Sequence, residues 1–287
     1  MSGLAARTAV YGRMIRFSHS VFALPFALAS AALAAVEGIR WEQVAWILVA
    51  MVAARSAAMG FNRLADHAID ARNPRTSGRE LPAGALSRRE VALFVAASAA
   101  IFVGAAALLN PLCLALSPVA LGVVFGYSYT KRFTALSHVF LGLALSIAPV
   151  GAWLAVRGRF DWPPIVLGLG VLAWVAGFDV IYACQDAEFD RREGLHSLPA
   201  RLGIRRALGT ARGLHLAAAG LLASLYWLVP LHPIYLAGVA GASLLLAYEH
   251  TLVRADDLSR IDVAFFTVNG WIGVGYLAAT VAAVVLR

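Results

Sequence analysis

The sequence predicts an all-α polytopic membrane protein, with about nine transmembrane helices arranged around a central cavity. Of the 287 residues, 61% are hydrophobic and only 14% are charged, whereas about one quarter of the residues of a soluble domain are charged. Long segments such as 91–109, 112–129 and 263–286 carry almost no charge. Because about twenty apolar residues are enough for a helix to cross the hydrocarbon core of a bilayer, each such segment predicts one span.

The predicted spans follow one another along the whole chain, which we expect to form a single domain, residues 1–287. By hydropathy they lie at about 18–36, 44–64, 91–109, 112–129, 136–156, 165–184, 207–228, 234–252 and 261–286. Asn-Pro and Leu-Pro pairs in the intervening segments favour loops, because proline disfavours a helical conformation in the residue before it. No cleavable signal peptide is expected, since the basic N-terminus leads directly into the first span.

Basic residues are distributed unevenly between the two sets of loops. The N-terminus and the loops after the second, fourth, sixth and eighth spans hold most of them, whereas the opposite loops hold few, among them Arg40, Arg157 and Arg159. By the positive-inside rule, this pattern predicts a protein of the bacterial cytoplasmic membrane with a cytoplasmic N-terminus and a C-terminus outside. The arginines therefore indicate contact with membrane lipid, and no nucleic-acid partner is expected.

A row of oxygen-bearing side chains closes the second predicted span. Asn62, Asp66 and Asp70 recur every four residues, so on a helix they lie along one face. Such a row suits a hard cation that takes oxygen ligands, Mg²⁺ or Ca²⁺. A solvated helix end would also place acids here, but the chain contains a second stretch of this kind, which favours the metal site.

The second stretch closes the sixth predicted span. Asp186 and Asp190 repeat the four-residue spacing, and Asp179 lies seven residues before Asp186, two turns earlier on the expected helix. Like the first row, it ends an apolar segment and opens an arginine-rich loop. Both rows are therefore expected on the cytoplasmic side.

The two stretches resemble copies of each other. Gly60-Phe61-Asn62 matches Gly177-Phe178-Asp179, and a later Leu-Pro-Ala segment followed by two arginines recurs at the same offset. We interpret the match as an internal four-helix duplication with halves at about 1–132 and 133–287. A repeat of this length would place the two acidic rows opposite each other across one cavity.

Carboxylates, a divalent cation and basic side chains together suit a diphosphate. Arg72, Lys131 and Arg132 adjoin the motifs and are the expected diphosphate ligands, whereas most other loop arginines are ordinary membrane anchors. A diphosphate site in a membrane indicates a lipid-linked substrate, with its head at the polar mouth and its tail in the cavity. An allylic prenyl diphosphate fits, because Mg²⁺ stabilises the leaving diphosphate while aromatic groups shield the allyl cation.

On these motifs the sequence resembles the UbiA superfamily of intramembrane aromatic prenyltransferases. The family's NxxxDxxxD motif matches the row that begins at Asn62. Its DxxxD motif matches Asp186 and Asp190, in a longer form that adds Asp179 and Tyr182. The segment 129–132 is similar to the family's basic loop. Within the family, the runs 75–84 and 190–197 are most similar to 4-hydroxybenzoate polyprenyltransferases.

This resemblance implies transfer of a polyprenyl group from a polyprenyl diphosphate to an aromatic acid such as 4-hydroxybenzoate, in ubiquinone or menaquinone biosynthesis. It implies that Mg²⁺ is held by Asn62, Asp66, Asp70, Asp186 and Asp190. It also implies that Asp179, Tyr182 and Asp186 are catalytic and face the reacting centre. Arg16, in the first span, matches a basic family position and is expected to meet the carboxylate of the acceptor.

Several alternatives stay open at the level of the sequence. The acceptor could instead be 1,4-dihydroxy-6-naphthoate, in the futalosine route to menaquinone, and other branches of the superfamily prenylate haem or chlorophyll precursors. A different class, an ion or proton transporter, is also compatible with intramembrane acids and an internal repeat. The transporter is disfavoured because the acids lie at span ends beside arginines and not at mid-depth.

Overall fold

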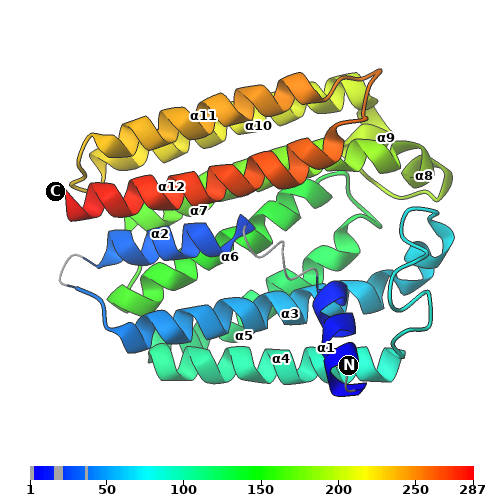
Figure 1. Cartoon of the computed structure of the whole chain (residues 1–287), viewed down its shortest axis with the longest axis horizontal. Helices are drawn as coiled ribbons and strands as arrows, with labels where there is room; N and C mark the ends of the chain where they lie inside the picture. The colour runs from blue at the N-terminus through cyan, green and yellow to red at the C-terminus, as the bar shows by residue number, and fades with distance from the viewer. Residues whose placement is uncertain (1–2, 16–21, 36–37) are drawn as a thin grey trace.

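The fold was analysed in a computed structural model, which describes residues 3–15, 22–35 and 38–287. Within these residues the chain is helical and forms no β-strand, apart from one isolated bridge between Arg254 and Asp257. The α-helices, labelled in Figure 1, are α1 (Gly3–Met14), α2 (Leu24–Ala34), α3 (Trp41–Arg72), α4 (Arg88–Leu109), α5 (Pro111–Thr130), α6 (Ser137–Arg157), α7 (Trp162–Ala183), α8 (Ala187–Arg192), α9 (Leu198–Leu202), α10 (Ile204–Ser224), α11 (Ile234–Leu252) and α12 (Asn269–Val285). Three short segments of other helix types lie between them: η2 (Cys184–Asp186), η3 (Leu225–Trp227) and η4 (Val263–Val268). The predicted all-α class is confirmed.

Each predicted span contains a helix. Among the described residues, six helical segments are long and apolar enough to cross a membrane: α3, α4, α5, α6, α7 continued through α8, and η4 continued through α12. The other three predicted spans correspond to the short apolar helix α2 and to α10 and α11. The chain is therefore a multi-pass membrane protein.

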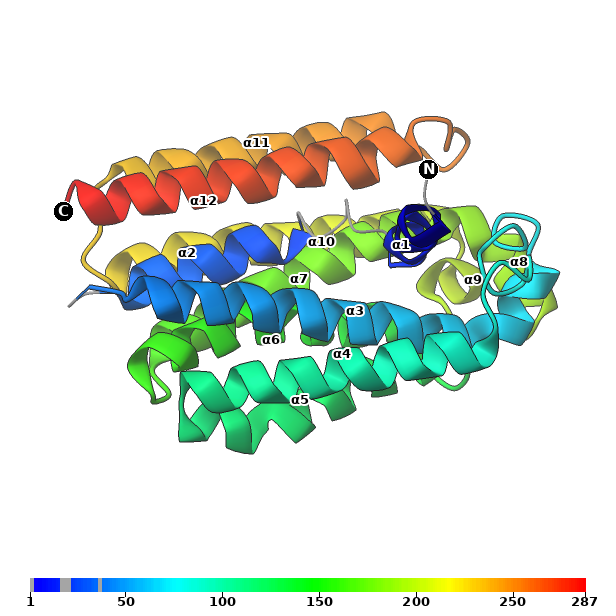
Figure 2. The same cartoon turned by 60° about the horizontal axis from the view of Figure 1, so that its bottom comes forward.

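The long helices lie side by side along the long axis of the molecule (Figure 1). On one side α7, α10, α11 and α12 pack together, on the other side α3, α4 and α5 do, and α2 and α6 lie between the two groups. The same arrangement is visible after rotation, where α1 is seen almost end-on (Figure 2). The short helices α8 and α9 and the end of α3 lie at one end of the bundle, and the C-terminus lies at the other end.

The helix boundaries follow from local capping. The side chain of Ser87 accepts a hydrogen bond from the backbone N–H of Glu90, and Glu90 accepts one from the backbone of Ser87 in return, so α4 begins with a capping box. The side chain of Asn110 caps α5 by accepting a hydrogen bond from the backbone N–H of Cys113, and its amide also donates to the carbonyl of Leu154 at 2.8 Å. The second bond ties the α4–α5 turn to α6.

Helix α3 is longer than a membrane requires. Its 32 residues extend over about 48 Å at 1.5 Å per residue, against about 30 Å of hydrocarbon. Measured from Trp41, the excess length begins near Asn62. The polar row 62–70, which the sequence placed on a helix, is indeed helical, and α3 is long enough to carry it beyond the hydrocarbon.

The second acidic stretch departs from the expected continuous helix. Helix α7 ends at Ala183, the chain tightens into the 3₁₀ turn 184–186, and only then does α8 begin. The expected continuous α-helix through Asp179, Asp186 and Asp190 is therefore interrupted, although all three side chains still line one cavity. Tight 3₁₀ turns are common where an α-helix ends, and here the side chain of Gln185 donates back to the carbonyl of Tyr182.

The two glycines of the duplicated tripeptides occupy equivalent contacts. A Cβ atom at Gly60, on α3, would lie 2.8 Å from Val95 of α4, and a Cβ atom at Gly177, on α7, would collide with the ring of His215 on α10. In both halves the glycine lets one helix approach the next closely. The contacts agree with a duplication, which stays a prediction.

The close approach of α7 to α10 can be tested by adding one methyl group. We expect Gly177→Ala to lower the free energy of unfolding by about 1–3 kcal/mol, because an overpacked interface must shift. The matched control is Gly209→Ala on α10, where a Cβ atom meets nothing within 4 Å. The control should be neutral or slightly stabilising, since alanine is the better helix former. Thermal unfolding in detergent measures both, and equal melting temperatures would contradict the proposed contact.

Candidate functional site

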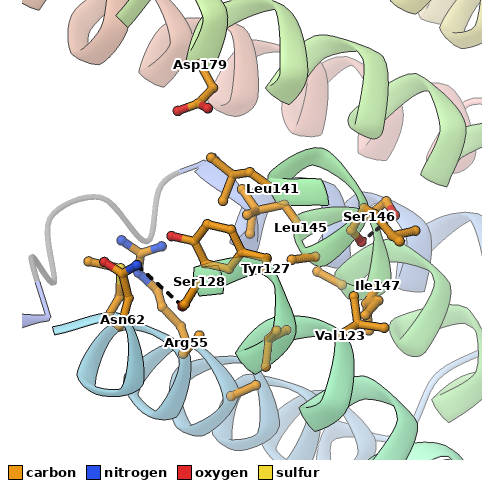
Figure 3. Close-up of a pocket in the computed structure, with 18 of the residues that line it drawn as sticks. Arg55, Asn62, Val123, Tyr127, Ser128, Leu141, Leu145, Ser146, Ile147 and Asp179 are labelled. Atoms are coloured by element: carbon orange, nitrogen blue, oxygen red, sulfur yellow. Dashed lines mark hydrogen bonds between the residues drawn. The ribbon is translucent and has the colours of Figure 1, made fainter. Parts of the chain in front are cut away.

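One large cavity, with a volume of about 680 Å³, lies among α3, α5, α6 and α7. This volume is within the range of ligand pockets in proteins. Its interior is apolar, lined by Val123, Leu141, Leu145 and Ile147, whereas Asn62, Asp66, Asp70, Asp179, Asp186 and Asp190 gather at its polar part. Figure 3 shows Asn62 and Asp179 facing this space from opposite helices. The two acidic stretches therefore meet at one cavity, as the sequence predicted.

The centre of the first row is Asp66, which is only 2% exposed. The ammonium of Lys131 donates to its Oδ2 at 2.6 Å, and the amide of Asn62 donates to the same oxygen at 3.0 Å. Its second oxygen, Oδ1, is buried without a hydrogen-bond donor among the described residues, and Arg132 lies 3.7 Å away. A buried carboxylate oxygen with a free lone pair is costly unless a ligand or cation completes it.

Two arginines from the α3–α4 loop hold the remaining acids. Arg79 donates to both oxygens of Asp70 at 2.8 Å. Arg75 makes a two-pronged ion pair with Asp186, and its Nη1 lies 3.4 Å from the hydroxyl of Tyr182. Although burial alone would lower the pKa of Arg75, the bond to Asp186 outweighs it and raises that pKa. The loop thus bridges the first acidic motif to the second.

Asp179 has a histidine partner that the sequence analysis did not find. Nδ1 of His138, on α6, lies 2.6 Å from Oδ2 of Asp179. The backbone N–H of Leu198 donates to the other ring nitrogen, Nε2, at 3.3 Å. Because Nε2 accepts, a neutral imidazole carries its hydrogen on Nδ1 and donates it to the carboxylate. His138 therefore fixes the orientation of Asp179 at the cavity wall.

The acidic side chains fit a divalent cation in chemistry, although Asp66, Asp70 and Asp186 are each paired with a cationic side chain of the protein. No three His, Cys, Asp or Glu side chains come close enough to form a metal cluster among the described residues. The acidic and amide side chains at the mouth offer oxygen atoms, the ligands that Mg²⁺ prefers. The buried Oδ1 of Asp66 accepts no hydrogen bond among the described residues. The residues present therefore fit such an ion, with their present cationic partners available to a bound anion.

The predicted diphosphate ligands lie in different surroundings. Lys131 lines the cavity, whereas Arg72 and Arg132 do not. Arg72 is exposed and pairs with Glu193 at 2.7 Å, and Arg132 donates to the carbonyl of Ala65. The predicted acceptor ligand, Arg16, lies outside the described residues.

Arg75 and Arg79 also line the cavity, although the sequence did not distinguish them from the loop arginines, most of which were expected to be membrane anchors. The signal for them was the Asn73-Pro74 turn. The side chain of Asn73 accepts from the backbone N–H of Arg75 at 2.9 Å and donates to Asp186 at 3.2 Å. This Asx-type turn folds the loop back over the end of α3, so the arginines return to the acids that they follow in the sequence.

The fold defines a multi-pass membrane protein. Its cavity has a charged mouth and an apolar interior. Residues 23–271 match the model of the UbiA prenyltransferase family. The chain belongs to this family, and it is a prenyltransferase, as its sequence motifs predicted. It is 32% identical over 254 residues to the 4-hydroxybenzoate octaprenyltransferase of Nitrosospira multiformis, covering 88% of this chain and 87% of the relative. The enzyme of the same name from Aromatoleum aromaticum is 30% identical, over 79% of this chain and 76% of the relative.

Solved structures show the same fold. A UbiA homologue from Aeropyrum pernix K1, in its apo form, is 33% identical and superposes with a TM-score of 0.84, over 92% of this chain and 97% of the homologue. A homologue from Archaeoglobus fulgidus, bound to GPP and Mg²⁺, superposes with a TM-score of 0.79 at 21% identity, over 96% and 99% of the two chains. The second likeness concerns the fold alone.

The bond between His138 and Asp179 is open to a direct test. We expect His138→Leu to lower the free energy of unfolding by about 1–3 kcal/mol, because it leaves the carboxylate and the N–H of Leu198 without partners. His196→Ala is the matched control: this histidine is exposed and contacts the α5–α6 loop through its backbone N–H. Thermal unfolding of both variants in detergent measures the difference, and equal stability would contradict the pairing.

Proposed function

We propose that the protein transfers a polyprenyl group from an allylic polyprenyl diphosphate to an aromatic acid such as 4-hydroxybenzoate, with Mg²⁺ as cofactor. The observation that carries this proposal is one cavity that joins both acidic motifs and several cationic side chains, among them Arg75, Arg79 and Lys131, to an apolar interior. A charged head and a long hydrocarbon tail on one substrate match these two parts. Family membership and the names of the curated relatives support the same reaction.

The diphosphate head would lie at the charged mouth. Lys131, Arg75 and Arg79 now bind Asp66, Asp186 and Asp70. When a metal ion binds the carboxylates, these cations become available to the phosphate oxygens. Asn62, Asp66, Asp70, Asp186 and Asp190 would hold Mg²⁺, which neutralises charge on the leaving diphosphate. The internal ion pairs at the mouth would thus be replaced by contacts with a metal ion and a diphosphate. The charges at the mouth would stay balanced after this exchange.

The reaction needs one bond broken and one formed. The C1–O bond of the prenyl diphosphate breaks, and its electron pair leaves with the diphosphate. A ring carbon of the acceptor, activated by the phenol oxygen, then bonds to C1, and the ring loses a proton. Asp179, oriented by His138 at 2.6 Å, is the carboxylate placed to accept it. The rings of Tyr182 and Phe265, whose centres lie 4.1 Å apart, flank the same part of the cavity and would shield the cation.

Arg55 is the residue placed to meet the carboxylate of the acceptor. It lies on α3, two turns before Asn62 on the same face, and lines the cavity. Figure 3 shows its side chain directed toward the space beside Tyr127 and Ser128. A guanidinium binds a carboxylate with two parallel hydrogen bonds. A hydroxynaphthoate carries the same carboxylate, so this contact serves either acceptor.

The two ends of the bundle support a cytoplasmic site. The loops that carry most of the basic residues lie at the same end as the cavity mouth, with α8 and α9, and the C-terminus lies at the opposite end. We therefore keep the proposed orientation, with the active site facing the cytoplasm and the C-terminus outside.

The proposed reaction is tested in membranes that contain the protein. Several polyprenyl diphosphates are combined with 4-hydroxybenzoate or hydroxynaphthoates, with and without EDTA. We expect Asp66→Asn to lower the transfer rate by a factor of about 100 or more, because it removes a charged metal ligand. Asp256→Asn makes the same chemical change in an exposed loop at the same end and should keep full activity. Activity that survives both EDTA and Asp66→Asn would sink the proposal.

The acceptor contact predicts a selective kinetic defect. We expect Arg55→Met to raise the KM for the aromatic acid by a factor of about 10–100, with a smaller change in the KM for the prenyl diphosphate. Arg89→Met, at an exposed position near the start of α4, is the control and should behave as the unaltered protein does. A rise in the KM of the diphosphate alone would place Arg55 on the other substrate.

A further inference from the structure

A buried polar cluster lies behind the cavity wall, outside the site described above. Its centre is Asn269, the first residue of α12, which is fully buried. Its Oδ1 accepts a hydrogen bond from Nε1 of Trp174 at 2.7 Å. Its Nδ2 donates toward Oε1 of Glu249 at 3.2 Å and toward the backbone carbonyls of Ala264 and Phe265 at 3.1 and 3.2 Å. One amide thus joins α7, α11 and the segment before α12.

The orientation of this amide is fixed by its partners. The indole N–H of Trp174 can only donate, so the atom that faces it must be the amide oxygen. The amide nitrogen then faces Glu249 and the two carbonyls, which can all accept. Every hydrogen-bonding atom of Asn269 is therefore used, in a site where an unmade bond is expensive.

The two carbonyls belong to the π-helical turn η4, residues 263–268. A π turn is one residue wider than a turn of an α-helix, because its backbone hydrogen bonds span five residues and not four. Such turns are frequent at functional sites. If this turn relaxed to an α-helix, the residues within it would rotate by about 100° about the helix axis, the angle between successive residues. The side chain of Asn269 binds two carbonyls of the wide turn and so opposes that relaxation.

The π turn places Phe265 in the cavity wall. The ring of Phe265 lies 4.1 Å from that of Tyr182 and meets Phe178 edge-on at 5.2 Å. Tyr182 in turn contacts Arg75, whose guanidinium lies 5.4 Å from the centre of its ring. A path of direct contacts therefore runs from Asn269 through Phe265 and Tyr182 to the charged mouth.

We propose that Asn269 is a positioning residue for prenyl transfer: it holds the π turn, so that Phe265 and Tyr182 form an aromatic wall that keeps water from the allyl cation. The proposal rests on the proposed function and adds a residue that determines whether the allyl cation reacts with the aromatic acceptor or with water. Asn269 itself lines no part of the cavity, so it is a positioning residue, and Phe265 is the cavity residue whose backbone carbonyl it binds.

Two nucleophiles compete for the cation in this view. When the ring carbon of the acceptor attacks C1, the products are the prenylated acid, diphosphate and a proton. When water attacks C1 instead, its oxygen forms the new bond, a proton is lost, and the products are a prenyl alcohol and diphosphate. The ratio of alcohol to prenylated acid therefore reports on the wall, and protein stability by itself does not change that ratio.

The experiment measures this ratio and kcat, with one polyprenyl diphosphate, for Asn269→Leu, Phe265→Ala and the double variant. We expect each single variant to raise the share of alcohol and to lower kcat by about tenfold or more. The double variant should resemble Phe265→Ala alone, because the two residues act in series. Glu249→Gln keeps a carbonyl oxygen facing Asn269 and is the control, with a ratio equal to that of the unaltered protein.

The outcomes separate the two proposals. An unaltered protein that prenylates no aromatic acid overturns the proposed function, whereas alcohol formation without acceptor still reports on the wall. Multiplied effects in the double variant, or an unchanged ratio in Asn269→Leu, overturn the role of Asn269. If Asn269→Leu does not fold, Asn269→Asp replaces it, because aspartate keeps the acceptor for Trp174 and lacks both amide hydrogens. The same ratio then decides.

Discussion

The ion pair between Asp66 and Lys131 is the interaction on which the site depends. Asp66 is 2% exposed, and an isolated carboxylate at such a position would be strongly destabilising. The cation that neutralises it, Lys131, directly follows α5, and the neighbouring carboxylates pair with arginines of the α3–α4 loop. These ion pairs join α3, the end of α5, the α3–α4 loop and η2 at one point. The charges that the proposed diphosphate and metal ion would need are already present as internal ion pairs, which hold the mouth of the cavity together.

Local periodicity and charge were enough to predict the segments that form the long helices and the first acidic row, whereas the helices α1, α8 and α9 were not predicted. The spacing of Asn62, Asp66 and Asp70 is a local property of one helix, so it survives in the structure without change. The second row was predicted less well, because the 3₁₀ turn at 184–186 depends on how α7 meets Arg75 and Asn73. A spacing of four residues does not distinguish one continuous helix from two short ones.

The side chains that pair with the acids could not be predicted from the sequence either, because these pairs depend on tertiary contacts. His138 lies 41 residues before Asp179, and Arg75 lies 111 residues before Asp186, so no spacing rule links them. The π turn at 263–268 is also hidden, since its six residues are mostly apolar and resemble any other part of a membrane helix. Only the buried amide of Asn269, an unusual group in such a segment, hints that the backbone there needs a hydrogen-bond donor.

The length of α3 has a consequence for the fate of the products. Because α3 is long enough to carry its acidic row past the hydrocarbon, the C1–O bond of the proposed substrate would break at the membrane–water interface. The two fragments differ greatly in solubility: inorganic diphosphate belongs in the aqueous phase, and the lengthened aromatic lipid belongs in the bilayer. The diphosphate could leave into water and the prenylated product into the bilayer, so neither would have to cross the other phase. The favourable partition of the two products would then contribute to driving the reaction forward.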